Sequence, residues 1–154
     1  LNAGRALSAA ESASLMELRA RLLSAFADVF VERATAEHVT ELRAVVEAMR
    51  ATLGAPGELA EQDYRFNEVL ARATGNFFLV LLMRSLREVH LRLGEVVYRE
   101  HGDVEAILAT QSALIDAIER RQSARVSKVL RTYLEGATEV VTGWLSRRDR
   151  AMPR

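Results

Sequence analysis

The sequence predicts an all-α fold, an antiparallel bundle of about six helices, and three observations support this prediction. Only 2 of the 154 residues are Pro and 8 are Gly, so few positions break a helix. Apolar residues recur at helical spacing along most of the chain, and no strand-like alternation competes with them. The connections between these segments are short, which favours antiparallel neighbours in a bundle. The length suits one domain with a sizeable core.

Each predicted helix is marked by a start or a stop signal. Ser8 opens a capping-box pattern, Thr35 and Asp103 are N-cap residues, and Gly75 fits a left-handed C-cap followed by another N-cap. Gly94 is expected to bend or loosen the fourth helix. The expected helices are residues 8–33, 35–54, 58–74, 77–100, 103–121 and 123–147.

Composition excludes several classes of protein. The 21 basic residues balance 21 acidic ones, so the chain as a whole has no electrostatic footprint for nucleic acid. The absence of Cys removes disulfides and thiolate metal sites, and it agrees with a cytoplasmic location. The longest apolar run, residues 77–83, is far shorter than the roughly 20 residues that span a membrane. Because the sequence begins at Leu1 rather than Met, we expect that a segment upstream is missing.

Polar residues interrupt the predicted apolar faces of several helices. Asp63 and Asn67, for example, share an inward face with Phe66 and Leu70. A carboxylate and an amide are costly to bury unless they have partners, so polar residues on several helices predict a shared internal cavity. The candidate binding residues are Arg19, Asp63, Asn67, His90, Gln111 and Tyr133.

Each candidate residue also has a purely structural explanation. An inward Tyr, Gln or Asn is commonly a core residue whose polar atoms are hydrogen-bonded. Arg19 is explained equally well by a buried ion pair with Asp63. His90 is explained by a satisfied histidine at the edge of the core. The sequence leaves these explanations open beside the binding one.

Three parts of the chain, within residues 15–137, resemble motifs of the FCD domain in the order that the family shows. Residues 17–22 resemble the opening E-x-R-x-x-L, although the Glu that follows in the family is Leu23 here. Residues 63–76 resemble D-x-x-F-H…A-x-G-N, with Asn67 in place of the His. Residues 111–118 and 130–134 are similar to H-x-x-I-x-x-A-I and M-x-x-H-L.

The resemblance implies that residues 1–154 form a single effector-binding domain of a GntR/FadR-type transcription regulator. In that family the domain follows a winged helix-turn-helix that binds operator DNA as a dimer, and this chain lacks such a segment. The implied partners are a small effector, a second copy of the chain and, only through the missing domain, operator DNA; no membrane is implied. The effector is expected to carry a carboxylate. Arg19 is the residue we expect to bind it, because a guanidinium pairs with a carboxylate bidentately.

Carried over by position, the metal ligands of the family fall on Asp63, Asn67, Gln111 and Tyr133. Three of these positions are His in the family. Amides are weak ligands for transition metals, and Tyr coordinates well only as the phenolate. We therefore expect no metal and no other cofactor. The four residues are expected to form a hydrogen-bonded polar cluster on the floor of the effector cavity.

An enzyme and a protein-interaction module are the two alternatives to ligand sensing. None of His38, His90 and His101 has a Glu three residues before it, as a di-iron bundle requires. No phosphate-binding loop, H-E-x-x-H motif or nucleophile elbow occurs, so we expect no enzymatic activity. The alternative to ligand sensing is a helical dimerisation or protein-interaction module without a small ligand. Such a module would have its inward polar residues paired with one another around no cavity.

Overall fold

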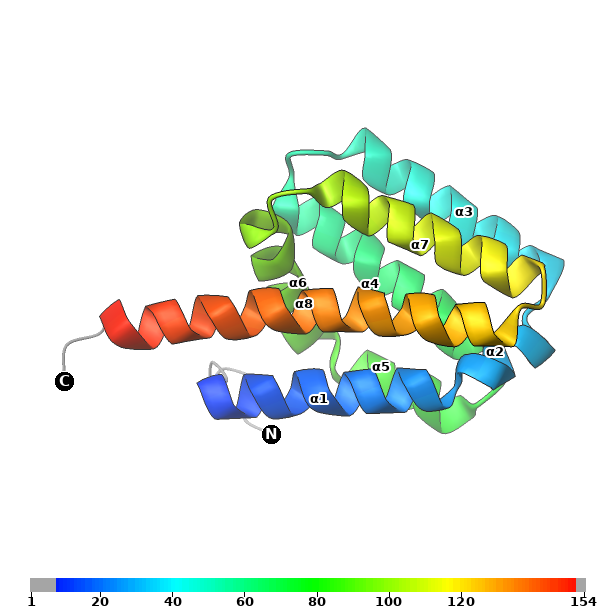
Figure 1. Ribbon diagram of the computed structural model, residues 1–154, viewed down its shortest axis with the longest axis horizontal. Helices are drawn as coiled ribbons and strands as arrows, with labels where there is room; N and C mark the ends of the chain where they lie inside the picture. Colours follow the sequence, from blue (N-terminus) through cyan, green and yellow to red (C-terminus); the bar gives the residue numbers. More distant parts are fainter. Residues whose placement is uncertain (1–7, 152–154) are drawn as a thin grey trace.

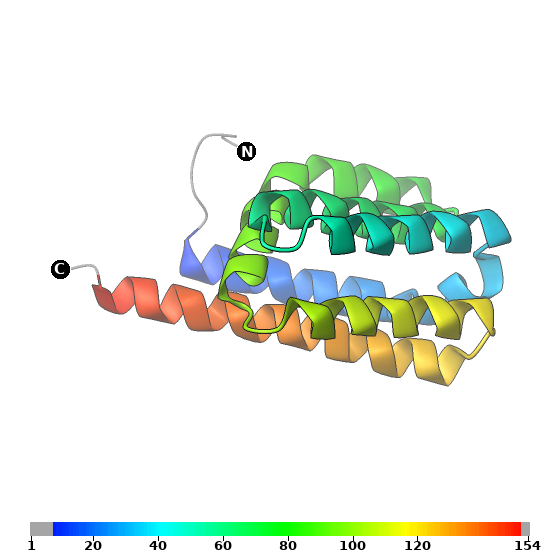
Figure 2. The ribbon, with the colours of Figure 1, turned by 90° about the horizontal axis from the view of Figure 1, so that it is seen from above.

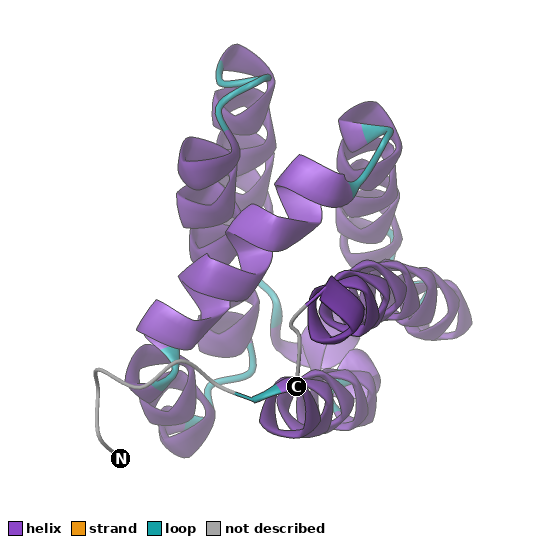
Figure 3. Cartoon of the chain, turned by 90° about the vertical axis from the view of Figure 1, so that its left-hand side faces the viewer, coloured by secondary structure: helices purple, strands orange, loops and turns teal. Residues whose placement is uncertain are grey.

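The computed structural model describes residues 8–151 and confirms the all-α prediction (Figure 1). Every regular element in that range is a helix (Figure 3). None of the helices in that range is both long and apolar enough to cross a membrane. Within residues 8–151 there are eight helices: α1 (Ala9–Ala25), α2 (Ala27–Arg33), α3 (Ala36–Ala51), α4 (Pro56–Ala73), α5 (Phe77–Ser85), α6 (Arg87–Glu100), α7 (Val104–Glu119) and α8 (Ser123–Ala151).

Two predicted helices are each divided, which is why the described residues form eight helices rather than about six. Phe26 separates α1 from α2 with φ −96° and ψ 4°, and Leu86 separates α5 from α6 with φ −101° and ψ 7°. Gly94, which was expected to bend or loosen the fourth helix, lies inside α6, and the predicted fourth helix is divided at Leu86 instead. A Cβ at Gly94 would lie 3.2 Å from the Cβ of Ala60, so this glycine permits close approach of α6 and α4.

The predicted helix caps are confirmed. The side chains of Ser8, Thr35, Asn76 and Asp103 each accept a hydrogen bond from a backbone N–H in the first turn of the helix that follows. Gly75 has φ 65°, the left-handed conformation expected at the end of α4. The local signals therefore predicted where four of the eight helices in the described residues start.

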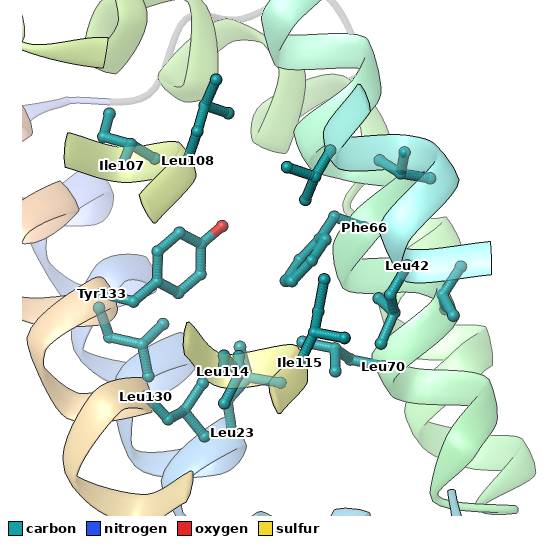
Figure 4. Packing of buried hydrophobic residues seen from close by; sticks show 14 of the residues in the cluster. Leu23, Leu42, Phe66, Leu70, Ile107, Leu108, Leu114, Ile115, Leu130 and Tyr133 are labelled. Atoms are coloured by element: carbon teal, nitrogen blue, oxygen red, sulfur yellow. The ribbon is translucent and has the colours of Figure 1, made fainter. Parts of the chain in front are cut away.

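The helices enclose one main core. α1 and α8 run antiparallel and side by side (Figures 1 and 2). α4 packs against α3, α5 and α6, while α7 packs against α3 and α8. α8 contacts α6 as well as α1, so it lies between these two helices and α7 in the bundle. Buried apolar side chains from several helices meet between these elements; Figure 4 labels Leu42, Phe66, Leu108, Ile115 and Leu130 among them.

Candidate functional site

Asp63 is the centre of a buried polar cluster. It lies in the middle of α4, and only 6% of its surface is exposed. Its carboxylate accepts five hydrogen bonds, from three other helices and from its own helix. Oδ1 accepts from the Tyr98 hydroxyl at 3.1 Å, Gln111 Nε2 at 3.0 Å and the Tyr133 hydroxyl at 2.5 Å, and Oδ2 accepts from Asn67 Nδ2 at 3.3 Å and His90 Nε2 at 3.0 Å.

These donors keep Asp63 ionised inside the core. Burial raises the pKa of Asp63, but the hydrogen bond and charge of His90, the charge of Arg19 and the hydrogen bond from Tyr133 together outweigh burial. The net pKa is therefore lowered. Burial and the negative charge of Asp63 raise the pKa of both Tyr98 and Tyr133, so their hydroxyls stay protonated and donate. The cluster is a carboxylate surrounded by hydrogen-bond donors, with a guanidinium nearby.

Arg19 reaches this cluster from α1. Its Nη2 donates to Asn67 Oδ1 at 3.2 Å and to the Tyr133 hydroxyl at 3.3 Å. The guanidinium carbon also lies 5.4 Å from the centre of the Tyr133 ring. Arg19 therefore acts on Asp63 through its charge and through these two neighbours rather than by a direct hydrogen bond. Its Nε is buried and has no hydrogen-bond partner.

A cavity of about 260 Å³ borders the cluster. Its wall is formed by residues of α1, α4, α5, α6, α7 and α8. Four of the six candidate residues line it: Arg19, Asp63, His90 and Tyr133. The structure thus brings all six candidates together, but only four of them face a space that could hold a ligand.

Asn67 and Gln111 lie behind the cavity wall and are fully buried. Asn67 Nδ2 lies 2.7 Å from the backbone oxygen of Asp63, an atom that can only accept, so the amide nitrogen must point toward Asp63. Gln111 likewise directs its nitrogen to the carboxylate, while its Oε1 is buried without a partner. Both amides therefore hold the side chain of Asp63 in place.

Tyr98 is the residue of the cluster that sequence reasoning missed. It is 5% exposed, donates to Asp63 and lines the cavity. The available signal was its position on α6, eight residues after His90 and hence about two turns along the same face. A buried Tyr is commonly an ordinary core residue, so this spacing alone does not identify it as part of a site.

The donor set does not fit a transition metal. The Asn67 and Gln111 side chains present nitrogen atoms to Asp63, and the oxygen of Asn67 faces Arg19 instead. Amide nitrogens that donate hydrogen bonds have no free lone pair for a metal, and a nearby guanidinium repels a cation. Within the described part of the chain, no three His, Cys, Asp or Glu side chains are grouped so that they could hold a metal ion.

The fold and this site define the class of protein: a helical domain with a polar cluster at the edge of an internal cavity. A domain model of the FCD family matches residues 14–136, which include all six candidate residues. The chain therefore belongs to the FCD family, the effector-binding domains of GntR/FadR-type regulators. This confirms the resemblance, and membership of a family of regulators supports the prediction that the chain is not an enzyme.

One curated relative is similar over most of this chain. The fatty acid metabolism regulator protein of Edwardsiella ictaluri (strain 93-146) is 27% identical over 107 residues, which make up 70% of this chain and 45% of the relative. The chain thus aligns with less than half the length of that regulator. The alignment therefore does not extend the activity or the partners of that whole regulator to this chain.

Proposed function

We propose that this chain senses a small carboxylate-bearing effector, which binds in the cavity beside Asp63 without a metal ion. The observation that carries the proposal is the position of Arg19 on the cavity wall with its Nε buried and unpartnered. A buried donor without an acceptor is costly, and a carboxylate in the cavity would supply that acceptor. A guanidinium is also the side chain best suited to this ligand.

We assign different roles to the six candidate residues. Arg19 binds the carboxylate, while His90 and Tyr133 contribute polar contacts from the wall of the cavity. Asp63 fixes His90 and Tyr133 through its own hydrogen bonds. Asn67 and Gln111 hold Asp63 from behind rather than contacting the effector. The five donors on Asp63 neutralise enough of its charge for an anion to bind nearby.

The cavity favours ligand sensing over the alternative of a protein-interaction module. A module without a small ligand would have its inward polar residues paired around no empty space, whereas a cavity borders this cluster. We further propose that the domain acts as a homodimer and reaches operator DNA through a winged helix-turn-helix in a longer protein. The relative, which is more than twice as long as the aligned segment, is consistent with such an additional domain.

A binding assay tests the role of Arg19. We expect a panel of small carboxylates to include at least one that raises the melting temperature of the protein. Arg19→Ala should raise the Kd of that ligand at least about tenfold, because a hydrogen bond to a charged group contributes about 1.5–3 kcal/mol. Arg65→Ala removes an exposed arginine of α4 and is the matched control. Equal affinity in the two variants would remove Arg19 from the site.

Elemental analysis tests the proposed absence of a metal. Protein purified without a chelator should contain no stoichiometric transition metal, and dialysis against EDTA should leave its melting temperature unchanged, since Asp63 already has five donors. A near-equimolar content of zinc, nickel or manganese, lost together with stability on EDTA treatment, would contradict this part of the proposal.

A further inference from the structure

The cavity wall is apolar everywhere except near the Asp63 cluster and at three other residues. Two of those, Thr110 and Thr132, donate their hydroxyls to backbone carbonyls one turn earlier in their own helices. The third, His101, accepts the backbone N–H of Asp103 through Nδ1. Leucines of α1, α5 and α6 and of the break between α5 and α6 supply much of the remaining wall: Leu15, Leu18, Leu22, Leu82, Leu86 and Leu93.

The apolar wall leads to the surface. Leu18 of α1 and Leu82 of α5 both line the cavity, and they are 49% and 37% exposed. Their position places the mouth of the cavity between α1 and α5. Phe78 lies one turn before Leu82 on the same face of α5 and is 76% exposed. Apolar surface therefore continues from inside the cavity, past its mouth, onto α5.

We infer that the effector is an amphipathic monocarboxylate, bound with its carboxylate inward at Arg19 and its hydrocarbon chain outward between Leu18 and Leu82. This inference rests on the proposed function and adds the class of the ligand and its direction. The charged end meets the buried guanidinium, and the chain replaces water along the leucines. At about 30 Å³ per water-sized group, the cavity of about 260 Å³ holds a carboxylate and a chain of roughly six to eight carbons.

The same wall disfavours the two other common types of small organic acid. A sugar acid would bury several hydroxyls against leucine side chains, and a dicarboxylate would place a second charge there. The threonine hydroxyls there already donate within their own helices, which leaves Nε2 of His101 as the remaining side-chain donor for such groups in that part of the wall. A hydrocarbon chain needs no such donor.

The first experiment compares ligands by titration calorimetry on the complete chain. We expect affinity to rise about fourfold for each methylene from butanoate to octanoate, the change that burial of one methylene supports. Decanoate should bind at least as tightly as octanoate, because the chain leaves through an open mouth. Octanedioate, gluconate and 1-octanol should each bind at least tenfold more weakly than octanoate.

The second experiment tests the mouth. Leu18→Ser and Leu82→Ser should each weaken octanoate binding about tenfold and leave butanoate within twofold, because only the longer chain reaches them. Leu81→Ser is the matched control: this leucine is 48% exposed, lies on the same helix as Leu82 and does not line the cavity. All three side chains are partly exposed, so the variants should remain folded, and circular dichroism verifies this.

The outcomes separate this inference from the proposed function. Carboxylates that bind through Arg19 with no dependence on chain length, or gluconate or octanedioate that binds more tightly than octanoate, would overturn the inference and leave the proposed function in place. If octanoate bound but decanoate did not, the end of the hydrocarbon chain would have to lie in the closed part of the cavity rather than at its mouth. That result would also overturn the inference. Failure of every carboxylate to bind would overturn both.

Discussion

Asp63 keeps a negative charge in the interior because the side chains around it donate hydrogen bonds to both of its carboxylate oxygens. Each carboxylate oxygen accepts at least two hydrogen bonds, and the donors come from α4, α6, α7 and α8. Removing one member of such a cluster leaves the others buried without partners, which costs more than the lost bond itself. Asp63 is therefore both a part of the site and a point at which four helices are held together.

The lowered pKa of Asp63 predicts a specific loss of stability in acid. The folded pKa lies below the unfolded value, so the unfolded chain binds this proton first as the pH falls. The stabilisation is complete above the unfolded value of about 3.8 and is lost as the pH drops through the folded pKa. Asp63→Asn should lower the free energy of unfolding by about 3 kcal/mol at pH 7, and by progressively less below pH 4.

Urea denaturation at pH 7, 5, 4 and 3 measures this effect. Glu88→Gln, which changes an exposed carboxylate of α6, is the control and should follow the wild-type profile. If the difference between wild type and Asp63→Asn stayed constant from pH 7 to pH 3, Asp63 would not be the titrating group.

At single positions, the sequence predicted which side chains point inward but not what each one touches. The helical period placed Asp63 and Asn67 on a buried face, and both are buried. That period carries no information on which atom of Asn67 faces Asp63 or on whether the residue reaches the cavity. Those details depend on Arg19 and Tyr133, which approach from helices distant in the sequence.

Among the elements, the two unpredicted breaks show where tertiary contacts override local signals. Neither Phe26 nor Leu86 is a Gly or Pro, and the chain on both sides has helical periodicity. Phe26 packs against the main core and against a smaller cluster of buried residues, Tyr64, Ala71, Leu79 and Met83. Leu86 lines the cavity. Both breaks therefore lie at side chains that face other helices or the cavity, surroundings that a single helical pattern cannot reveal.

Gly94 gives the clearest prediction for the packing of two helices. Gly94→Val would place a branched side chain against Ala60 at the crossing of α4 and α6, where even a Cβ lies 3.2 Å from the Ala60 Cβ. Overpacking of this kind should lower the free energy of unfolding by about 1–3 kcal/mol. Gly143→Val in α8 is the control, since a Cβ there meets only the end of the Arg147 side chain, at 3.6 Å, and it should be nearly neutral. Urea titrations would contradict the close approach if both variants were equally stable.

In the whole molecule, the cavity lies between α1 and the rest of the bundle. α1 packs along α8, and Arg19 links it to α4 and α8 through Asn67 and Tyr133 (Figure 4 shows Tyr133 among the buried residues). α1 also begins next to the described N-terminal end, where a domain upstream would connect. An effector that binds Arg19 would therefore act on the helix best placed to pass a signal to such a domain.

This arrangement predicts that ligand binding stabilises α1 more than the distant helices. Opening of α1 would release a ligand held by Arg19, so at a ligand concentration ten times the Kd such opening should be about tenfold rarer. Hydrogen exchange followed by mass spectrometry should show this added protection in residues 9–25, with the carboxylate that stabilises the wild type most as the ligand. α3, which contributes no residue to the cavity wall, is the internal control. Equal protection of α1 and α3 would mean that the ligand stabilises the bundle as a whole. The same protection of α1 in Arg19→Ala at matched occupancy would mean that Arg19 does not couple the cavity to α1.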